Sequence, residues 1–322
     1  MRKKKIFWLV VAAALALLAW RAGASAALLV AALLAAALAL LFTVKWVAAG
    51  FGLKKLVQAR ETRGFDAMTA ALKQRLGEPD AFRFVVLGDT RNVVRVAREV
   101  YRRAAGESPA VIFHTGDIVR GGTPWEFLRN HVALLGITDP APMFCVPGNH
   151  DRGVRRDFSA FKALYGDDRF CLDFGGCRFA GFNNSGRKRV TREDLDWLDR
   201  ELGRPGAGHR FVFLHIPPAF FEETFVSDTR RRGFKENAAE FHALMRRHGV
   251  DEVFMAHIHG YATTVLEGVR YTLTAGGGAP LSGRLAREGQ AFNYVVVNVS
   301  PEGVRRVVVR GRDSDWTRTE EN

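Results

Sequence analysis

Short apolar runs of strand length alternate with polar, helix-forming stretches over residues 82–147, and each run leads into a polar signature. Val85-Val86-Leu87 leads into Gly88-Asp89, Val111-Ile112-Phe113 into Gly116-Asp117, and Met143–Val146 into Gly148–Asp151. Runs rich in β-branched and aromatic residues are typical of buried strands in an α/β protein. We therefore expect strands at 82–88, 110–114 and 143–146, with helices at about 93–105 and 124–135 between them.

Strands dominate the second half of the chain. The pattern predicts them at 170–174, 177–182, 211–215, 252–256, 269–274, 293–299 and 304–310. Helices are expected at 194–202, where Thr191 is placed to cap the first turn, and at 238–247. These strands are too many for one simple parallel sheet. We therefore predict an α/β fold with two packed mixed β-sheets flanked by helices.

The polar signatures are expected to meet at one rim, because chemistry in open α/β sheets collects outside the carboxyl ends of the strands. His257 and His259 would share a direction, since side chains alternate along a strand. Carboxylate, amide and imidazole groups suit divalent metal ions that hold a hydroxide against a phosphoryl group. The candidate ligands are Asp89, Asp117, Asn149, His215, His257 and His259.

The order of these signatures resembles that of the calcineurin-like metallophosphoesterases: Gly-Asp, Gly-Asp, Gly-Asn-His-Asp, an isolated His, then x-His-x-His. The resemblance covers roughly residues 82–310 and extends to Phe182–Ser185, His215–Pro218 and Ala275–Gly278. It implies the same two-sheet sandwich. It also implies hydrolysis of phosphate mono- or diesters by attack of a hydroxide that bridges two divalent metal ions, of type Mn, Fe, Zn or Mg.

The resemblance also implies a role for each residue of the set. Asp89 and His259 would hold the first metal ion, Asn149, His215 and His257 the second, and Asp117 would bridge both. His150 would stabilise the equatorial oxygens or protonate the leaving alkoxide, and Asp151 would hold the imidazole of His150 in a useful orientation. The remaining histidines carry no motif and are interpreted as strand or surface residues: His114, His131, His209, His242 and His248.

One departure from the family pattern lies in the first motif. The family commonly has Asp-x-His there, with that histidine on the first metal ion, whereas this chain has Arg91. A guanidinium has no acceptor and cannot bind a cation. The stretch after Asp117 also lacks the tyrosine of a purple-acid-phosphatase-like replacement. The first ion would then bind more weakly. Arg91 is interpreted as a ligand for a substrate phosphate, with pairing to an acid such as Asp117 as the alternative.

Three functions stay open at this point. The leading one is a membrane-anchored dinuclear metal phosphoesterase. The second is a metal-binding but catalytically weak membrane sensor or scaffold, with a hydrolase of lipid pyrophosphates as a further alternative. The third is nuclease action, which the charge disfavours. The partner is a phosphorylated substrate, soluble or lipid-linked. Nucleic acid is not expected as a partner: of the net charge of +13, residues 1–63 carry +9, which leaves +4 for the rest, and duplex binding needs a basic stripe.

Two apolar runs precede this region, at residues 6–20 and 26–44. The second would span about 28 Å as a helix, close to the hydrocarbon core of a bilayer, and the first only about 22 Å. The first is therefore a short span or a signal-peptide core. We expect an anchor at 1–45, a basic juxtamembrane linker helix at 46–80, the metallophosphoesterase domain at 81–312 and a polar tail at 313–322.

Basic residues flank the two runs on their outer sides, and only Arg21 lies between them. The positive-inside tendency then predicts a hairpin with both ends in the cytoplasm. We expect a multi-pass protein of the cell (inner) membrane with a cytoplasmic catalytic domain, and anionic lipid head groups as the partner of the basic end. The competing topology treats the runs as one irregular anchor and exports the domain.

The linker is expected to contain a helix, because Phe65, Met68, Leu72 and Leu76 fall at helical spacing before Gly77. This helix would lie on the bilayer surface or pack on the catalytic domain. Three cysteines, Cys145, Cys171 and Cys177, form no disulfide framework. Cys171 and Cys177 flank a turn and could face each other, although two packed thiols are the favoured interpretation.

Overall fold

The computed structural model describes residues 24–91, 94–153, 157–186, 189–226, 232–312 and 315–321. The chain divides into two compact units, residues 1–51 and 52–322. The apolar run predicted at residues 6–20 lies outside the described residues. The apolar run at 26–44 lies within α2 (Ala24–Arg63), a helix of 40 residues.

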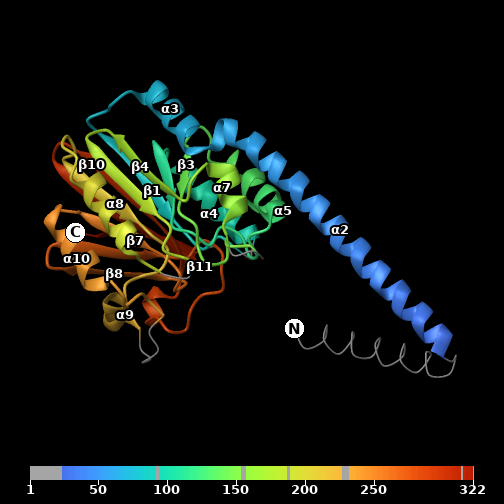
Figure 1. The fold of residues 1–322 in the computed structure, drawn as a ribbon. Helices are drawn as coiled ribbons and strands as arrows, with labels where there is room; N and C mark the ends of the chain where they lie inside the picture. Colours follow the sequence, from blue (N-terminus) through green and yellow to red (C-terminus); the bar gives the residue numbers. More distant parts are fainter. Residues whose placement is uncertain are drawn as a thin grey trace. The chain divides into compact units, whose positions relative to one another are not determined.

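Two six-stranded sheets form the second unit within the described residues (Figure 1). The order in the first sheet is β12-β11-β10-β1-β2-β3, and in the second it is β4-β5-β6-β7-β9-β8. The strands are β1 Phe82–Leu87, β2 Val111–His114, β3 Met143–Cys145, β4 Arg169–Phe174, β5 Cys177–Phe182, β6 His209–Phe213, β7 Glu252–Met255, β8 Tyr261–Leu266, β9 Val269–Thr274, β10 Phe292–Ser300, β11 Gly303–Arg312 and β12 Asp315–Glu321. The predicted pair of mixed sheets flanked by helices is confirmed.

Each sheet has a parallel centre. Strands β1, β2 and β3 run parallel to one another, and so do β5, β6, β7 and β9. The outer pairs β1–β10 and β4–β5 are antiparallel. The parallel strands are the ones that the polar signatures follow. Their carboxyl ends therefore bring those signatures to one edge of each sheet.

The two sheets meet through a phenylalanine core. Phe113 of β2 stacks on Phe213 of β6 with ring centroids 4.3 Å apart and on Phe179 of β5 at 4.8 Å. Phe84 of β1 meets Phe211 of β6 edge to face at 5.0 Å. All five rings are fully buried. Stacked and edge-to-face rings fix the spacing of the sheets, which in turn fixes the distance between signatures that lie on different sheets.

Helices cover the outer faces of the sheets. Their bounds are α4 Val94–Gly106, α5 Pro124–Phe127, α6 Ala133–Leu135, α7 Ser159–Tyr165, α8 Arg192–Leu202, α9 Ala219–Phe225 and α10 Ala238–Arg247, with a 3-10 turn η2 at Arg287–Gly289. The single helix expected at 124–135 is interrupted by a π-helical turn, η1 (Leu128–Val132). Thr123 and Glu126 form a capping box at its start, and Thr191 and Asp194 form the predicted one on α8.

Helix α3 (Phe65–Leu76) packs on the second unit, of which it is a part. Phe65, Met68 and Leu72 are buried, and Leu76 is 41% exposed. The Phe65 ring lies 5.2 Å from Tyr165 and 5.8 Å from Phe144 between centroids, stacked on both. Gly77 ends the helix with a positive φ of 63°. Of the two placements left open by the sequence, the structure shows packing on the domain.

The N-terminal part of α2 presents a different surface. Its large apolar side chains are exposed, among them Leu28 at 73% and Phe42 at 72%. The helical stretch from Leu28 contains a window with a mean hydropathy of 2.4, of which 0% is buried. By length and composition, this is one helix within the described residues that could cross a membrane.

The expected polar tail at 313–322 is wrong for Asp315–Glu321, which form the edge strand β12, antiparallel to β11. Two side chains attach it to the domain. The Trp316 ring lies 6.2 Å from that of Tyr294, and the Arg318 guanidinium pairs with Glu107 at 2.5 Å. Polar composition did not prevent strand formation, because an edge strand buries only part of its side chains.

The three cysteines are free thiols. Cys171 pairs in register with Ala180, and Cys177 with Phe174. The two thiols at the β4–β5 turn therefore do not oppose each other across the hairpin. The favoured interpretation as two packed thiols is confirmed.

Candidate metal centre

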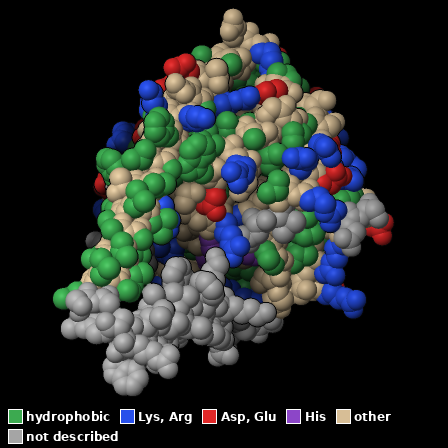
Figure 2. Space-filling model, turned by 90° about the vertical axis from the view of Figure 1, so that its right-hand side faces the viewer, with side chains coloured by type: hydrophobic (Ala, Val, Ile, Leu, Met, Phe, Trp, Pro, Cys, Tyr) green, Lys and Arg blue, Asp and Glu red, His purple; other side chains and the backbone are tan. Residues whose placement is uncertain are grey.

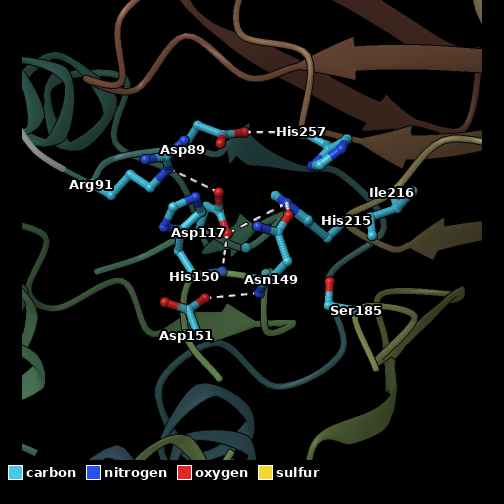
Figure 3. Close-up of polar contacts among 12 residues, drawn as sticks. Asp89, Arg91, Asp117, Asn149, His150, Asp151, Ser185, His215, Ile216 and His257 are labelled. Atoms are coloured by element: carbon cyan, nitrogen blue, oxygen red, sulfur yellow. Dashed lines mark hydrogen bonds and ion pairs between the residues drawn. The ribbon is translucent and has the colours of Figure 1, made fainter. Parts of the chain in front are cut away.

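The polar signatures lie where the sequence places them, directly after parallel strands. Asp89 follows β1, Asp117 follows β2, Asn149 follows β3, His215 follows β6 and His257 follows β7. The first three belong to one sheet and the histidines to the other. Facing carboxyl ends of two sheets thus bring oxygen ligands and imidazoles to a common position (Figure 3).

Three of these residues have backbone conformations that side chains rarely adopt. The φ angles of Asp89, Asp117 and His257 are +54°, +55° and +75°. Left-handed backbone costs on the order of 1–3 kcal/mol for residues other than glycine and concentrates at functional sites. The three residues share no local sequence pattern that demands such a turn. Their common feature is that each turns a side chain toward the same point at a strand end.

The ligand atoms of Asp89, Asp117 and His215 all lie within 4.8 Å of one another, and all three residues are buried. Nε2 of His215 lies 3.2 Å from Oδ1 of Asn149 and 3.5 Å from Oδ1 of Asp117. Two ligands of one metal ion at bond lengths near 2.1 Å are about 3.0–3.4 Å apart. The donor set therefore has the spacing of a metal site.

Backbone carbonyls set the tautomers of two histidines. Nδ1 of His215 donates to the carbonyl of Thr115 at 2.9 Å, and Nδ1 of His259 donates to the carbonyl of Pro280 at 2.6 Å. In each neutral ring the lone pair then lies on Nε2, toward the carboxylates. This is the usual arrangement for a metal-binding imidazole, whose other nitrogen donates to a fixed acceptor.

His257 completes the group of imidazoles. Its ring centroid lies 5.2 Å from that of His215, and the planes are nearly perpendicular. Burial, and then the nearby His215 and Arg189, hold the pKa of His257 well below its ordinary value. The ring is therefore neutral near pH 7, as a metal ligand must be.

Asp89 carries an orphan oxygen that fits a bound cation. The residue is 0% exposed. Its Oδ2 accepts from the backbone N–H of His257 at 3.0 Å, whereas its Oδ1 has no hydrogen-bond partner among the described residues. Nε2 of His259 lies 3.3 Å from this Oδ1. A buried carboxylate oxygen without a hydrogen-bond donor is costly unless a cation neutralises it, so the site fits a metal ion.

Arg91 reaches into the same position. Its Nε lies 2.9 Å from Oδ2 of Asp117, and its Nη2 lies 3.1 Å from Nε2 of His259. The side chain is 13% exposed. Of the two interpretations of Arg91, the structure shows pairing with Asp117. It also shows a contact with His259 that the sequence analysis did not anticipate.

The charge of Asp117 is stabilised by its neighbours. Burial works against the ionised carboxylate, but His215, His150 and Arg91 together outweigh it, so the pKa of Asp117 is lowered. The backbone N–H of His150 also donates to its Oδ1 at 2.8 Å. Asp117 is thus an ionised carboxylate with contacts on both oxygens, the state in which it can bind a metal ion.

The expected pairing of Asp151 with His150 is wrong. Nδ1 of His150 donates to the carbonyl of Arg120 at 2.8 Å. The Asp151 carboxylate is buried and accepts from the backbone N–H groups of Ile118, Val119 and Gly148 at 3.1, 2.9 and 2.8 Å. Asp151 therefore clamps the loop after β2 to the loop after β3, because its short side chain points into the protein between them.

Two glycines make this close approach possible. A Cβ atom on Gly116, whose φ is +97°, would lie 2.7 Å from the backbone nitrogen of Gly148 and 2.9 Å from Nδ1 of His215. A Cβ atom on Gly148 would collide with the backbone nitrogen and Oδ1 of Asp117. Both glycines stand in the motifs because a side chain at either position would push the two loops apart.

Sequence reasoning missed the supports that lie outside the motifs. Oδ1 of Asn184 accepts from the backbone N–H groups of His215 and Ile216 at 3.1 and 3.0 Å. Its Nδ2 donates back to the carbonyl of Ile216 at 2.7 Å. Asn184 thus holds the turn that presents His215. The sequence indicated Asn184 only through the Phe182–Ser185 stretch, to which the family resemblance extends.

Positive charge surrounds the centre. Figure 2 shows histidine side chains on this face with Lys and Arg side chains near them. Arg189 affects the pKa of His257, and burial together with Arg152 lowers the pKa of Arg189 itself. Arg189 thus lies near a candidate ligand in addition to Arg91, and Arg152 lies near Arg189. Positive charge at this position favours an anionic ligand.

Comparison with known proteins gives a family, a sequence relative and several solved structures. The family model described as calcineurin-like phosphoesterase matches residues 82–261. A probable cyclic nucleotide phosphodiesterase of Synechococcus sp. is 25% identical over 170 residues, which are 51% of this chain and 63% of that protein. This chain therefore spans less than two thirds of that relative.

Two solved structures share the fold. A purple acid phosphatase from yellow lupin seeds matches with a TM-score of 0.60 at 15% identity, over 76% of this chain and 53% of that one. GAP50, the anchor in the inner membrane complex of Plasmodium, matches with a TM-score of 0.55 at 13% identity, over 75% of this chain and 89% of that one. These matches concern the arrangement of sheets and helices.

Proposed function

The chain belongs to the calcineurin-like phosphoesterase family, and from this premise we propose that it is a metal-dependent phosphoesterase that hydrolyses phosphate mono- or diesters. One observation carries the proposal: the ligand atoms of Asp89, Asp117 and His215, from three strand ends on two sheets, lie within 4.8 Å of one another. Two buried carboxylates beside an imidazole would not stabilise the fold by themselves, because buried charges destabilise a fold unless they are neutralised.

The ligand positions follow the family pattern. In that pattern Asp89 and His259 with Asp117 correspond to the ligands of the first divalent ion, and Asn149, His215 and His257 with Asp117 to those of the second. A bound divalent ion lowers the pKa of a coordinated water and polarises a phosphoryl oxygen. The chain supplies the fixed geometry for this chemistry, since backbone carbonyls and Asn184 hold the imidazoles in place.

His150 is the proposed acid for the leaving group. Its backbone N–H is bound to Asp117 and its Nδ1 to the carbonyl of Arg120, so Nε2 is the atom left to donate a proton to the departing alkoxide. Arg91, Arg152 and Arg189 supply positive charge for the phosphoryl oxygens. Guanidinium groups suit this geometry because they donate two parallel hydrogen bonds.

Diesters are the first substrates to test, because the Synechococcus relative is described as a probable cyclic nucleotide phosphodiesterase. The exposed apolar part of α2 supports a second proposal, that the protein is anchored in the cell membrane. An anchored enzyme could act on lipid-linked phosphates or pyrophosphates as well as on soluble ones. We propose the predicted hairpin with a cytoplasmic catalytic domain as the topology.

A metal-binding scaffold of low activity is the second candidate. The contacts of Arg91 with Asp117 and His259 favour it, because they engage atoms that the family uses for metal binding. His150 distinguishes the two functions. A scaffold has no use for an imidazole held with one nitrogen free beside a phosphate site, whereas a hydrolase needs one.

The proposed function is tested with the purified full-length protein in detergent. Phosphomonoesters, phosphodiesters and lipid pyrophosphates are assayed with Mn²⁺, Zn²⁺, Fe²⁺ or Mg²⁺, in parallel with the Asp117→Asn variant. Turnover of at least one class by the natural chain and not by Asp117→Asn supports the proposal. Metal binding without turnover of any class would instead support the scaffold.

A further inference from the structure

Arg91 lies where a metal ion would have to bind. The first position of the family pattern offers three groups, the carboxylates of Asp89 and Asp117 and the Nε2 atom of His259. The Arg91 guanidinium contacts two of them, with Nε 2.9 Å from Oδ2 of Asp117 and Nη2 3.1 Å from Nε2 of His259. Figure 3 shows its side chain directed at Asp117.

These contacts use the atoms that a metal ion needs. Nδ1 of His259 donates to the carbonyl of Pro280, so the lone pair of the neutral ring lies on Nε2, the atom that Arg91 approaches. Oδ2 of Asp117 is the oxygen that faces away from His215, whose Nε2 is 3.5 Å from Oδ1. A carboxylate that bridges through both oxygens gives one oxygen to each ion, and the Asp117 oxygen on the side of the first position is paired with Arg91.

The position of Arg91 is also fixed through its backbone. Its N–H donates to the carbonyl of Asp117 at 3.2 Å, and the N–H of Asp89 donates to the carbonyl of Gly116 at 2.9 Å. The loop after β1 is thereby tied to the loop after β2 at Asp89 and at Arg91. At 13% exposure, the Arg91 side chain is largely withdrawn from water.

The second metal position does not use the two atoms that Arg91 contacts. Oδ1 of Asp117, Oδ1 of Asn149 and Nε2 of His215 retain the spacing of ligands to one ion, at 3.2 and 3.5 Å. Asp89 borders the same position, with its ligand atom within 4.8 Å of those of Asp117 and His215. One divalent ion can therefore bind at this position without the two atoms that Arg91 contacts.

We propose that the Arg91 guanidinium replaces the first metal ion, so that the chain binds one divalent ion per molecule, at Asp117, Asn149, His215 and His257. The inference rests on the proposed function, because that function requires a bound divalent ion. A guanidinium supplies a permanent positive charge and hydrogen-bond donors, but it has no site for a water ligand. Arg91 would thus bind and orient the phosphoryl group, and water activation would depend on the single ion.

The test is the metal stoichiometry of full-length protein purified without chelator and supplemented with Mn²⁺, in the natural chain, Arg91→His and Arg91→Lys. Arg91→His restores the histidine common at this place in the family and should raise the content from one ion to two. Arg91→Lys keeps the charge and serves as the matched control, with one ion. Electron spin resonance should show isolated Mn²⁺ in the natural chain and exchange-coupled Mn²⁺ in Arg91→His.

Two Mn²⁺ ions in the natural chain would overturn the inference and leave the proposed function standing, because hydrolysis could then use both ions. One ion in both the natural chain and folded Arg91→His would also overturn it, since Arg91 would not be what excludes the second. No bound ion in any of the three proteins would overturn the inference and the proposed function together. If Arg91→His does not fold, the number of Mn²⁺ ions bound per molecule of the natural chain still tests the inference.

Discussion

Nδ1 of His150 lies 2.8 Å from the carbonyl oxygen of Arg120, so a backbone group orients this imidazole. The neighbouring Asp151 is buried among backbone N–H groups and does not take part. The two residues of one motif therefore do different work. Asp151 holds two loops together, and Nε2 of His150 has no hydrogen-bond partner among the described residues.

Replacing His150 by Ala should lower the turnover of substrates with poor leaving groups by about 10²–10⁴, because a lost general acid has an effect of that size. The metal content should not change, since the backbone N–H that contacts Asp117 remains. Steady-state kinetics and elemental analysis measure both. His209→Ala is the matched control, because His209 lies at the other end of β6 and contacts Asp251. Equal rates in His150→Ala and the natural chain would refute the proposed acid.

Replacing Asp151 by Asn should destabilise the protein by about 2–3 kcal/mol, because an amide nitrogen would face a buried backbone N–H in place of a carboxyl oxygen that accepts from it. The loss is read from the shift of the denaturation midpoint in metal-free protein. Turnover per folded, metal-loaded molecule should fall less than in His150→Ala. A variant with natural stability and a large loss of turnover would point instead to a direct role in orienting His150.

Replacing Gly148 by Ala should weaken metal binding on the order of 10–100-fold, as expected for a change that displaces ligands through their supports. The new methyl group would collide with the backbone nitrogen and Oδ1 of Asp117. Isothermal titration with Mn²⁺ measures the effect. Gly106→Ala is the control, because a Cβ atom there meets nothing within 4 Å. Natural affinity in Gly148→Ala would mean that the loops can separate without cost.

The proposed topology predicts the behaviour of reporters fused after Asn322. Basic residues on the outer sides of the two apolar runs favour a hairpin with both ends in the cytoplasm. A fluorescent protein that folds only in the cytoplasm should be active, and an alkaline phosphatase that requires export should be silent. The reverse pair of results would place the catalytic domain outside the cytoplasm, and the candidate substrates would become those of the cell envelope.

Much of the candidate metal centre could be predicted from the sequence, because its residues directly follow strands that the hydrophobic pattern identifies. The runs before Asp89, Asp117 and His215 are buried on both faces and read as continuous apolar segments. Once the strands are assigned as parallel, their carboxyl ends must coincide. The assignment of each ligand to the first or the second metal ion came from the family resemblance. The spacing of these residues along the chain does not give that assignment.

The rest depends on contacts between distant loops. The acceptor for His150 is a carbonyl 30 residues earlier. Every residue has a backbone carbonyl, so the sequence does not indicate which one accepts this hydrogen bond. Arg91 pairs with Asp117 and His259 only because three strand ends approach one another. The edge strands β8 and β12 were missed because they are half exposed and carry polar residues such as Thr263 and Thr317.

The most direct test of the central claim is the hydrolysis of bis(p-nitrophenyl) phosphate by the full-length protein in detergent, before chelation, after it, and during a titration with Mn²⁺. Turnover should disappear with the metal and return in proportion to bound Mn²⁺, and Asp117→Asn should recover none of it. Turnover that persists unchanged in the metal-free protein would contradict a metal-dependent phosphoesterase built on Asp117, Asn149, His215 and His257.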